Sequence, residues 1–304
     1  MNEQSKNYGF VYKVVQYAAW PVLLTFSISL TALGFVYDHP MIAFNLSYVI
    51  LAISLLLLER AMPFEPKWQQ KDGQLLADIG HTLVSKGTVQ AILVFGGVIG
   101  LSEIVKPAVD TQGGFWPADW IMPLQVLLGL IIAEFGLYWA HRMAHEWKPL
   151  WPYHSIHHSV TRLWVVNTGR FHFIDSLISI VLGSGLLLIA GSPLEVIQWV
   201  SAVTAFIGIL THCNVDMKFG PLSYLFNTPE LHRWHHSKDL REGDKNYCEN
   251  IMIWDHVFRS YYNADYRPPS DIGIKEYMPE RFREQLVLPF RWKKVQAGYN
   301  SKKL

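Results

Sequence analysis

The chain has 304 residues, of which 50% are hydrophobic and 14% aromatic, while only 17% are charged. Because roughly a quarter of the residues of an average soluble protein are charged, this composition favours a membrane protein. The formal net charge is +1, and such a balanced charge gives no reason to expect nucleic acid as a partner.

Six segments of the chain are long, apolar and nearly free of charge. A helix that spans a bilayer needs about 20 such residues, within a range of roughly 17–25. Four of the segments meet this length comfortably: 18–37, 87–105, 120–140 and 194–212. The segment at 41–58 is slightly short, and the one at 173–190 is interrupted by Gly183 and Gly185. We therefore predict an all-α, multi-pass membrane helical bundle, whose last two segments form a full or a partly inserted hairpin.

The distribution of positive charge predicts one orientation in the membrane. If the N-terminus is cytoplasmic, the loop at 60–76, the segment at 141–172 and the chain after residue 213 are cytoplasmic as well. Of the 26 lysines and arginines, this assignment leaves only Lys106 on the other side. Cytoplasmic loops carry an excess of Lys and Arg, so we expect this sidedness, in a bacterial inner membrane or an endoplasmic reticulum.

Eight of the 13 histidines lie in three windows of the sequence, which read HRMAH, HSIHH and HRWHH. These eight are His141, His145, His154, His157, His158, His232, His235 and His236. Residues three and four apart share one face of a helix, so each window is expected to direct its imidazoles toward one point. Neutral imidazole is the commonest metal ligand in proteins and suits iron, zinc, copper or nickel. One ion takes about four to six ligands, so eight histidines predict two metal ions in a cytoplasmic cap.

Prolines mark the helices that carry the windows. The fourth apolar segment runs into the first window, and Pro149 and Pro152 end that helix, while Pro152 can also begin the next one. Thr228, Pro229 and Glu230 have the pattern of an N-cap residue, a proline at the first helical position and an acid in the first turn. We therefore expect the second and third windows on short helices.

Four further residues are candidates for the site. His212 ends the sixth apolar segment, and we expect it to be an additional ligand rather than a histidine that only satisfies a helix end, with Asn214 beside it as a further candidate. Glu134 is an acid inside a membrane helix, which is costly and points to function. We expect it to accept the second ring N–H of a metal-bound histidine, the alternative being a hydrogen bond to a neighbouring helix. His172, three residues before Asp175, fits an active-site and a structural role equally well.

The other histidines in polar or isolated positions are expected to be structural. His81 follows Asp78 by three residues, where the third apolar segment would enter the membrane. Hydrogen bonding is the expected role there, and His39 and His256 are expected to be structural as well.

Around the windows, the sequence reads LYWAHRMAH, LWPYHSIHHS, NTPELHRWHHS and DKNYCENIMIWD. The order H-x-x-x-H, H-x-x-H-H, H-x-x-H-H among apolar helices resembles the fatty acid hydroxylase superfamily, which includes sterol desaturases, sphingolipid hydroxylases and alkylglycerol monooxygenases. The resemblance is strong over about 130–262 and weak before it. One departure is Cys248, which stands where the family usually has glycine.

The resemblance implies an enzyme with two iron ions that uses O2 to hydroxylate or desaturate a lipid: a sterol, a fatty acyl chain, a sphingolipid or an ether lipid. Zinc is a possible occupant of the same ligands in isolated protein. Electrons would come from a separate donor of the ferredoxin, cytochrome or reductase type, or from a pterin. The expected organisation is a transmembrane scaffold over 1–120, a catalytic domain over 121–265 and a cytoplasmic tail over 266–304.

Two other functions use the same ligands. One is a membrane haem protein that transfers electrons, although paired haem ligands usually lie inside spanning helices. The other is a zinc-dependent membrane hydrolase or a metal transporter. The H-E-x-x-H pattern of zinc proteases is absent, because Pro149 stands four residues after His145.

Overall fold

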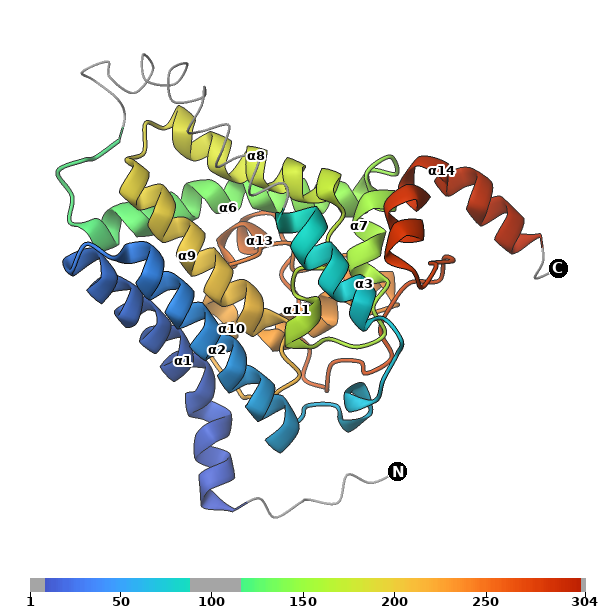
Figure 1. The fold of residues 1–304 in the computed structure, drawn as a ribbon, viewed down its shortest axis with the longest axis horizontal. Helices are drawn as coiled ribbons and strands as arrows, with labels where there is room; N and C mark the ends of the chain where they lie inside the picture. Colours follow the sequence, from blue (N-terminus) through green and yellow to red (C-terminus); the bar gives the residue numbers. More distant parts are fainter. Residues whose placement is uncertain (1–8, 88–115, 302–304) are drawn as a thin grey trace.

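The computed structural model describes residues 9–87 and 116–301, and its regular structure over these residues is helical (Figure 1). Isolated β-bridges join three pairs of positions within the described residues, but no strand forms there. The predicted all-α fold is therefore confirmed. The predicted apolar segment at 87–105, apart from residue 87, and Lys106 lie outside the described residues.

Four described helices are long and apolar enough to cross a membrane: α1 (Phe10–Val36), α2 (Pro40–Ala61), α6 (Met122–Glu146) and α9 (Leu194–Thr211). The segment expected to be slightly short thus forms a helix of 22 residues, because Pro40 begins it and the polar pair Glu59–Arg60 still belongs to its last turn. Helix α8 (Phe173–Ile189) has 17 residues and falls below the length of the other four. It is continuous through both glycines that were expected to interrupt it.

The glycines instead allow α6 and α8 to pack closely. Both helices lie side by side in Figure 1. A Cβ atom on Gly136 would overlap the backbone carbonyl of Leu182, and one on Gly183 would come within 3.0 Å of the Leu137 side chain. Small residues at such positions let two helix backbones approach each other. This contact fixes α8 against the helix that carries the first histidine window.

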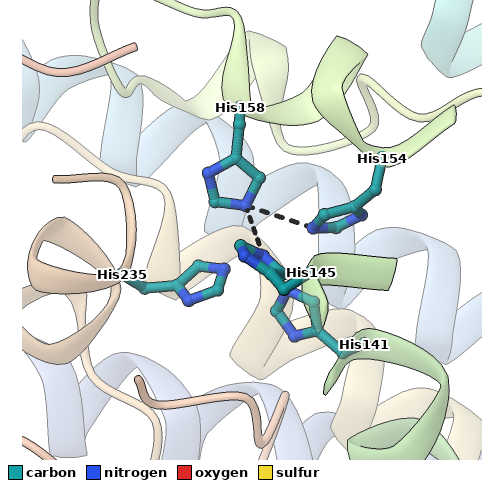
Figure 2. A group of neighbouring side chains, drawn as sticks. All are labelled: His141, His145, His154, His158 and His235. Atoms are coloured by element: carbon teal, nitrogen blue, oxygen red, sulfur yellow. Dashed lines mark hydrogen bonds between the residues drawn. The ribbon is translucent and has the colours of Figure 1, made fainter. Parts of the chain in front are cut away.

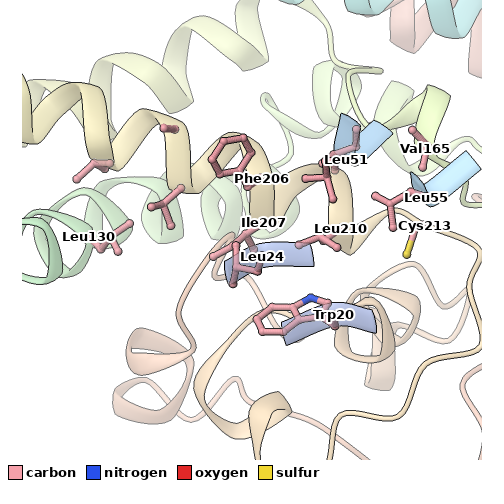
Figure 3. Packing of buried hydrophobic residues seen from close by; sticks show 14 of the residues in the cluster. Trp20, Leu24, Leu51, Leu55, Leu130, Val165, Phe206, Ile207, Leu210 and Cys213 are labelled. Carbon is pink, nitrogen blue, oxygen red and sulfur yellow. The ribbon is translucent and has the colours of Figure 1, made fainter. Parts of the chain in front are cut away.

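The main hydrophobic core joins α1, α2, α6 and α9 (Figure 3). Trp20, Leu55, Phe206 and Leu210 are almost completely buried in it. The outward faces of the same helices carry exposed apolar side chains, for example Leu57, which is 66% exposed. Helices that face lipid carry apolar side chains both on the face buried in the protein and on the outward face.

Short helices surround the polar end of this bundle. They are η1 (Pro66–Gln69), α3 (Leu75–Gly80), the π-helix η2 (His81–Lys86), α7 (Trp151–His158), η4 (Val165–Asn167), α10 (Leu222–Leu225), α11 (Pro229–His235), α12 (Leu240–Gly243) and α13 (Ile253–Val257). The C-terminal helix α14 (Phe282–Asn300) packs against α7 and α3. Two of these helices, α7 and α11, carry the second and third histidine windows.

The prolines lie where the sequence predicts them. Pro152 is in the first turn of α7, and Pro229 is the first residue of α11. Thr228 is the residue before that helix, but its hydroxyl does not cap it and pairs with the Ser223 hydroxyl at 2.9 Å instead. The fixed φ of Pro229 therefore determines the start of α11 without help from a side-chain cap.

A buried ion pair ties the loop after α7 to α3. The Arg170 guanidinium donates to Asp78 at 2.7 Å, and both side chains are 1% exposed. Arg170 also donates to the Ile156 carbonyl in α7. Removing either partner would leave an uncompensated buried charge, so the pair fixes the position of α7 relative to the scaffold.

The α6–α8 contact predicts a difference between two glycine substitutions. We expect Gly136→Ala to lower the stability of the protein by about 1–3 kcal/mol, because the added methyl group overlaps the α8 backbone. Gly185→Ala in α8 is the matched control, since a Cβ there has no neighbour within 4 Å. Thermal unfolding in detergent measures both; equal melting temperatures for the two variants would contradict this account of the contact.

Candidate metal centre

Nine histidines form two adjacent groups at the end of the bundle. His141, His145, His154, His158 and His235 make up the first histidine group (Figure 2). His157, His212, His232 and His236 make up the second histidine group. Within each group, one ring nitrogen of every member lies within 4.8 Å of those of the others. The structure thus brings together all nine histidines that the sequence singled out as ligands.

The two H-x-x-H-H windows do not direct their imidazoles toward one point, and that expectation is wrong. In α7, His154 and His158 belong to the first group, whereas His157 belongs to the second. In α11 and its C-cap, His232 and His236 belong to the second group, and His235 belongs to the first. Adjacent residues of a helix differ by about 100° in direction, so the neighbours at i+3 and i+4 diverge. Each window therefore supplies both groups.

Backbone carbonyls orient two rings of the first group. The Nδ1 atom of His141 donates to the Tyr247 carbonyl at 2.8 Å. The Nδ1 atom of His235 donates to the Lys245 carbonyl at 2.7 Å. A carbonyl oxygen can only accept, so Nδ1 carries the proton in both rings and each Nε2 presents a lone pair. Both Nε2 atoms are buried and have no hydrogen-bond partner.

Carboxylates orient two further rings of this group. His154 Nδ1 lies 2.9 Å from an Asp175 oxygen, and His145 Nδ1 lies 3.1 Å from an Asp244 oxygen. An ionised carboxylate only accepts, so these rings also turn unprotonated Nε2 atoms inward. A carboxylate on the outer ring nitrogen is a usual partner of a metal-binding histidine, because it fixes the tautomer and raises the basicity of the ligand.

The inward nitrogens of the first group come too close to one another for neutral rings alone. His158 Nε2 lies 3.1 Å from the Nε2 atoms of both His145 and His154 (Figure 2). His158 has at most one proton to donate there, and the other two atoms have none. Lone pairs that converge in this way repel each other unless a cation lies between them. The donor set of the first group therefore fits a metal ion.

The second group has the same character. His212 Nδ1 donates to the Asn167 amide oxygen at 3.1 Å, and the Asn167 amide nitrogen donates to the Arg162 carbonyl, which fixes the orientation of the amide. His212 Nε2 then faces His232 Nε2 at 2.8 Å, and His236 Nε2 lies 3.1 Å from the same atom. Three imidazole nitrogens again converge, so this donor set also fits a cation.

Burial keeps five of the clustered histidines neutral. It lowers the pKa of each of them well below the ordinary histidine value: His157, His158, His232, His235 and His236. Neighbouring imidazoles lower these pKa values further, because two close imidazolium ions would repel. At neutral pH the rings are uncharged and offer their lone pairs as ligands.

The two histidine groups are in direct contact through their rings. The rings of His158 and His236 stack with their centroids 4.3 Å apart, and those of His157 and His158 lie 5.4 Å apart. Two cations bound in the groups would therefore be neighbours in one centre.

Glu134 does not accept from a histidine, which corrects the expectation for this residue. Its carboxylate accepts from the backbone N–H groups of Glu249 at 2.5 Å and Asn250 at 3.0 Å, and from the Asn250 amide at 2.8 Å. Two helical turns separate Glu134 from His141, about 10 Å along the axis, so the carboxylate is out of reach of that ring. It accepts hydrogen bonds from buried N–H groups of residues 249–250 instead. This role resembles the alternative expectation, a hydrogen bond to a neighbouring helix, although its partner is a non-helical segment.

His172 and Asn214 also lie outside both groups and have structural partners. His172 is the N-cap of α8: its Nδ1 accepts from the Ile174 N–H, and its Nε2 donates to the Leu286 carbonyl in α14. The Asn214 amide pairs with both backbone groups of Glu65. Each side chain satisfies backbone groups at the end of an element, and these bonds account for a polar residue at that position.

Sequence reasoning missed the groups that orient the rings. The spacing of three residues in the sequence associates Asp175 with His172. In the structure Asp175 instead contacts His154, which lies on another helix. Asp244 is 99 residues from His145 and gives no local signal. The carbonyls of Lys245 and Tyr247 have no signal at all, since every residue has a carbonyl.

Comparison with known proteins places the chain in a family. Residues 126–260 match the family model described as fatty acid hydroxylase. The ornithine lipid hydroxylase OlsE of Rhizobium tropici is 48% identical over 282 residues, covering 92% of this chain and 85% of that protein. The alkylglycerol monooxygenase of Homo sapiens is 32% identical over 146 residues, which cover 48% of this chain and 32% of the human protein. The alkylglycerol monooxygenase of Xenopus tropicalis is 30% identical over 196 residues, which cover 64% of this chain and 43% of the Xenopus protein.

No solved structure matches this chain. The likeness to the Rhizobium tropici protein nevertheless extends over most of both sequences, and the family model covers all nine clustered histidines. The chain therefore belongs to the fatty acid hydroxylase family.

Proposed function

We propose that this protein is a membrane-bound, O2-dependent hydroxylase that uses two iron ions and acts on a membrane lipid. The observation that carries the proposal is the convergence of nine imidazoles in two adjacent groups, each with ring nitrogens within 4.8 Å of one another. The names of the relatives support hydroxylation as the reaction, since the Rhizobium tropici protein is a hydroxylase and the human protein is a monooxygenase. We therefore favour hydroxylation over desaturation.

In this proposal each histidine group holds one iron, and iron supplies the one-electron and oxygen chemistry that side chains lack. Zinc is expected to bind the same nitrogens in isolated protein. Asp175 and Asp244 keep the rings of His154 and His145 in the tautomer that presents Nε2 to the ion. The chain thus contributes rigid, neutral ligands, and electrons come from a separate donor of the ferredoxin, cytochrome or reductase type or from a pterin.

The location of the centre suits an apolar substrate. His141 and His145 lie in the last turns of α6, and His212 follows the last residue of α9, so two membrane-length helices end at the centre. A lipid can therefore reach it from the bilayer. We place the centre at the cytoplasmic face, in a catalytic part over 121–265 with 1–120 as scaffold. The substrate class suggested by the Rhizobium tropici relative is an ornithine lipid.

The haem and zinc alternatives explain the geometry less well. Five ring nitrogens within 4.8 Å leave no room for the plane of a macrocycle between them. A catalytic zinc site has about three protein ligands and an open position, fewer than either group offers. We therefore favour iron and oxygen chemistry.

Lipid analysis tests the reaction. We expect cells that make ornithine lipid and express this chain to accumulate an ornithine lipid with one additional oxygen atom, because a hydroxylase supplied with O2 and two electrons from its donor would add one oxygen atom to the lipid and release the other as water. Heavy-isotope O2 should label the new hydroxyl group, as measured by mass spectrometry. Cells expressing a chain with His157→Ala and His235→Ala are the control. A product lacking two hydrogens would indicate desaturation, and oxygen derived from water would contradict O2 dependence.

Metal analysis tests the two groups. We expect purified wild-type protein loaded with iron to hold two ions per chain, and His235→Ala or His236→Ala to hold about one, because each removes a ligand from one group. His256→Ala is the control, since that ring bonds to the Tyr224 carbonyl and belongs to neither group. Full iron content and full activity in His235→Ala would rule out the ligand assignment.

Removing an orienting carboxylate should weaken metal binding without removing a ligand. We expect Asp175→Ala to lower metal affinity about 10–100-fold, as loss of such outer partners does, and Asp175→Asn to have a smaller effect because its amide oxygen still accepts from His154. Competition with a chelator measures both affinities. Glu195→Gln is a matched control, since Glu195 is likewise an acid in the first turn of an apolar helix but contacts no histidine. An unchanged affinity in Asp175→Ala would show that the carboxylate does not tune the site.

A further inference from the structure

Two oppositely charged side chains, Lys86 and Glu249, lie near the histidine groups, and neither forms an ion pair among the described residues. The ion pairs of the described residues, which have N···O distances up to 4.0 Å, include neither of them. Within the same residues, the Glu249 carboxylate and the Lys86 ammonium make no side-chain hydrogen bond. The opposite charge with the largest effect on the pKa of Lys86 is nevertheless Glu249, and the one with the largest effect on the pKa of Glu249 is Lys86.

Lys86 is held beside the second histidine group. It is the last residue of the π-helix η2, a form that frequently occurs at functional sites. His81 begins this helix and, as the sequence predicted, is hydrogen-bonded: its Nδ1 lies 3.1 Å from the Phe171 carbonyl. The Lys86 ammonium lies 5.3 Å from the Phe171 ring, and that ring stacks on His157 with centroids 4.2 Å apart. One aromatic ring therefore separates the ammonium from a proposed ligand.

Glu249 is held beside the first histidine group. Its backbone N–H is bonded to Glu134, so the start of its side chain is fixed to α6. Asp175 raises and His154 lowers the pKa of its carboxyl group, and His154 belongs to the first group. Lys86 thus lies near the second histidine group, and Glu249 lies near the first.

Charges in such positions are costly. Burial lowers the pKa of the Lys86 ammonium and raises the pKa of the Glu249 carboxyl, and each charge partly compensates the other. A buried charge is retained at low cost only when it is paired at close range. A ligand that carries an anion and a cation would pair with both side chains at once.

We propose that Lys86 and Glu249 bind the zwitterionic headgroup of the lipid substrate, Lys86 its carboxylate and Glu249 its ammonium group. The proposal rests on the proposed lipid hydroxylase function. The chemical class is a lipid with an amino-acid headgroup, and an ornithine lipid belongs to it, because ornithine joined through one amino group keeps a carboxylate and an ammonium. A zwitterion with a phosphate in place of the carboxylate offers the same pair of charges.

Steady-state kinetics with ornithine lipid in nanodiscs tests the contacts. We expect Lys86→Met and Glu249→Gln each to raise KM about tenfold or more while kcat and iron content change little, since a hydrogen bond to a charged group contributes about 1.5–3 kcal/mol to binding. Lys293→Met, on the exposed face of α14, is the control and should keep the wild-type KM.

The double variant separates headgroup binding from a purely structural pair. If the two charges only compensate each other, Lys86→Met with Glu249→Gln should recover the KM of the wild type. If they bind opposite ends of a headgroup, the double variant should have the highest KM, near the product of the two single effects. Recovery of the wild-type KM would overturn the proposal.

Changing the lipid tests the same contact without changing the protein, which covers variants that do not fold. Ornithine lipid methyl-esterified at its carboxylate should bind wild-type protein about tenfold more weakly and should be insensitive to Lys86→Met. Equal binding of ester and acid would overturn the role of Lys86. Equally tight binding of phosphatidylethanolamine would overturn the assignment to a carboxylate.

Equilibrium binding to nanodiscs distinguishes this proposal from the proposed function. Wild-type protein that binds ornithine lipid in a Lys86-dependent way but oxidises no lipid would support the headgroup site and contradict the hydroxylase. Protein that oxidises the lipid with an unchanged KM in both single variants would support the hydroxylase and contradict the headgroup site.

Discussion

The physical constraint on which this structure depends is the repulsion between imidazole lone pairs that converge in the two histidine groups. A cation bound between the ring nitrogens would remove this repulsion. Carbonyl, amide and carboxylate acceptors fix the outer proton of five rings, so their Nε2 atoms turn inward unprotonated. Without a cation the buried nitrogens repel each other and leave hydrogen-bonding capacity unused, as for the Nε2 atoms of His141 and His235. Metal binding should therefore contribute directly to folding, since ligands from α6, α7, α11 and the end of α9 meet only in the folded chain.

Two buried polar residues near the centre, Glu134 and Arg170, bond to the surrounding segments rather than to the clustered histidines. Glu134 satisfies N–H groups of the segment that includes Glu249, and Arg170 joins Asp78 to the carbonyl of Ile156 in α7. Irregular backbone close to a membrane is tolerated only where its polar groups are satisfied inside the protein. Acids and amides that look catalytic in the sequence can therefore be needed for the short helices to keep a fixed position.

The sequence allowed the apolar helices, the helix starts at Pro152 and Pro229 and the nine clustered histidines to be predicted, because each gives a local signal of length, proline position or spacing. It did not reveal the partner of Glu134, since the bonds join residues 115 and 116 positions apart. Nor could it show which groups orient the rings: two are backbone carbonyls, and Asp175 acts on a histidine of another helix. Contacts between distant segments are set by packing, which no local pattern encodes.

The split of the H-x-x-H-H windows explains why two histidine groups arise from so short a sequence. Positions i and i+4 differ by about 40° around a helix and serve one group, while i+3 points about 100° away from i+4 and serves the other. Helix α7 gives two rings to the first group and one to the second, and α11 with its C-cap does the reverse. The H-x-x-x-H window has no i+3 histidine, and both of its rings join the first group. The windows alone leave the second group with three imidazoles, and His212 supplies the fourth from the end of a membrane helix.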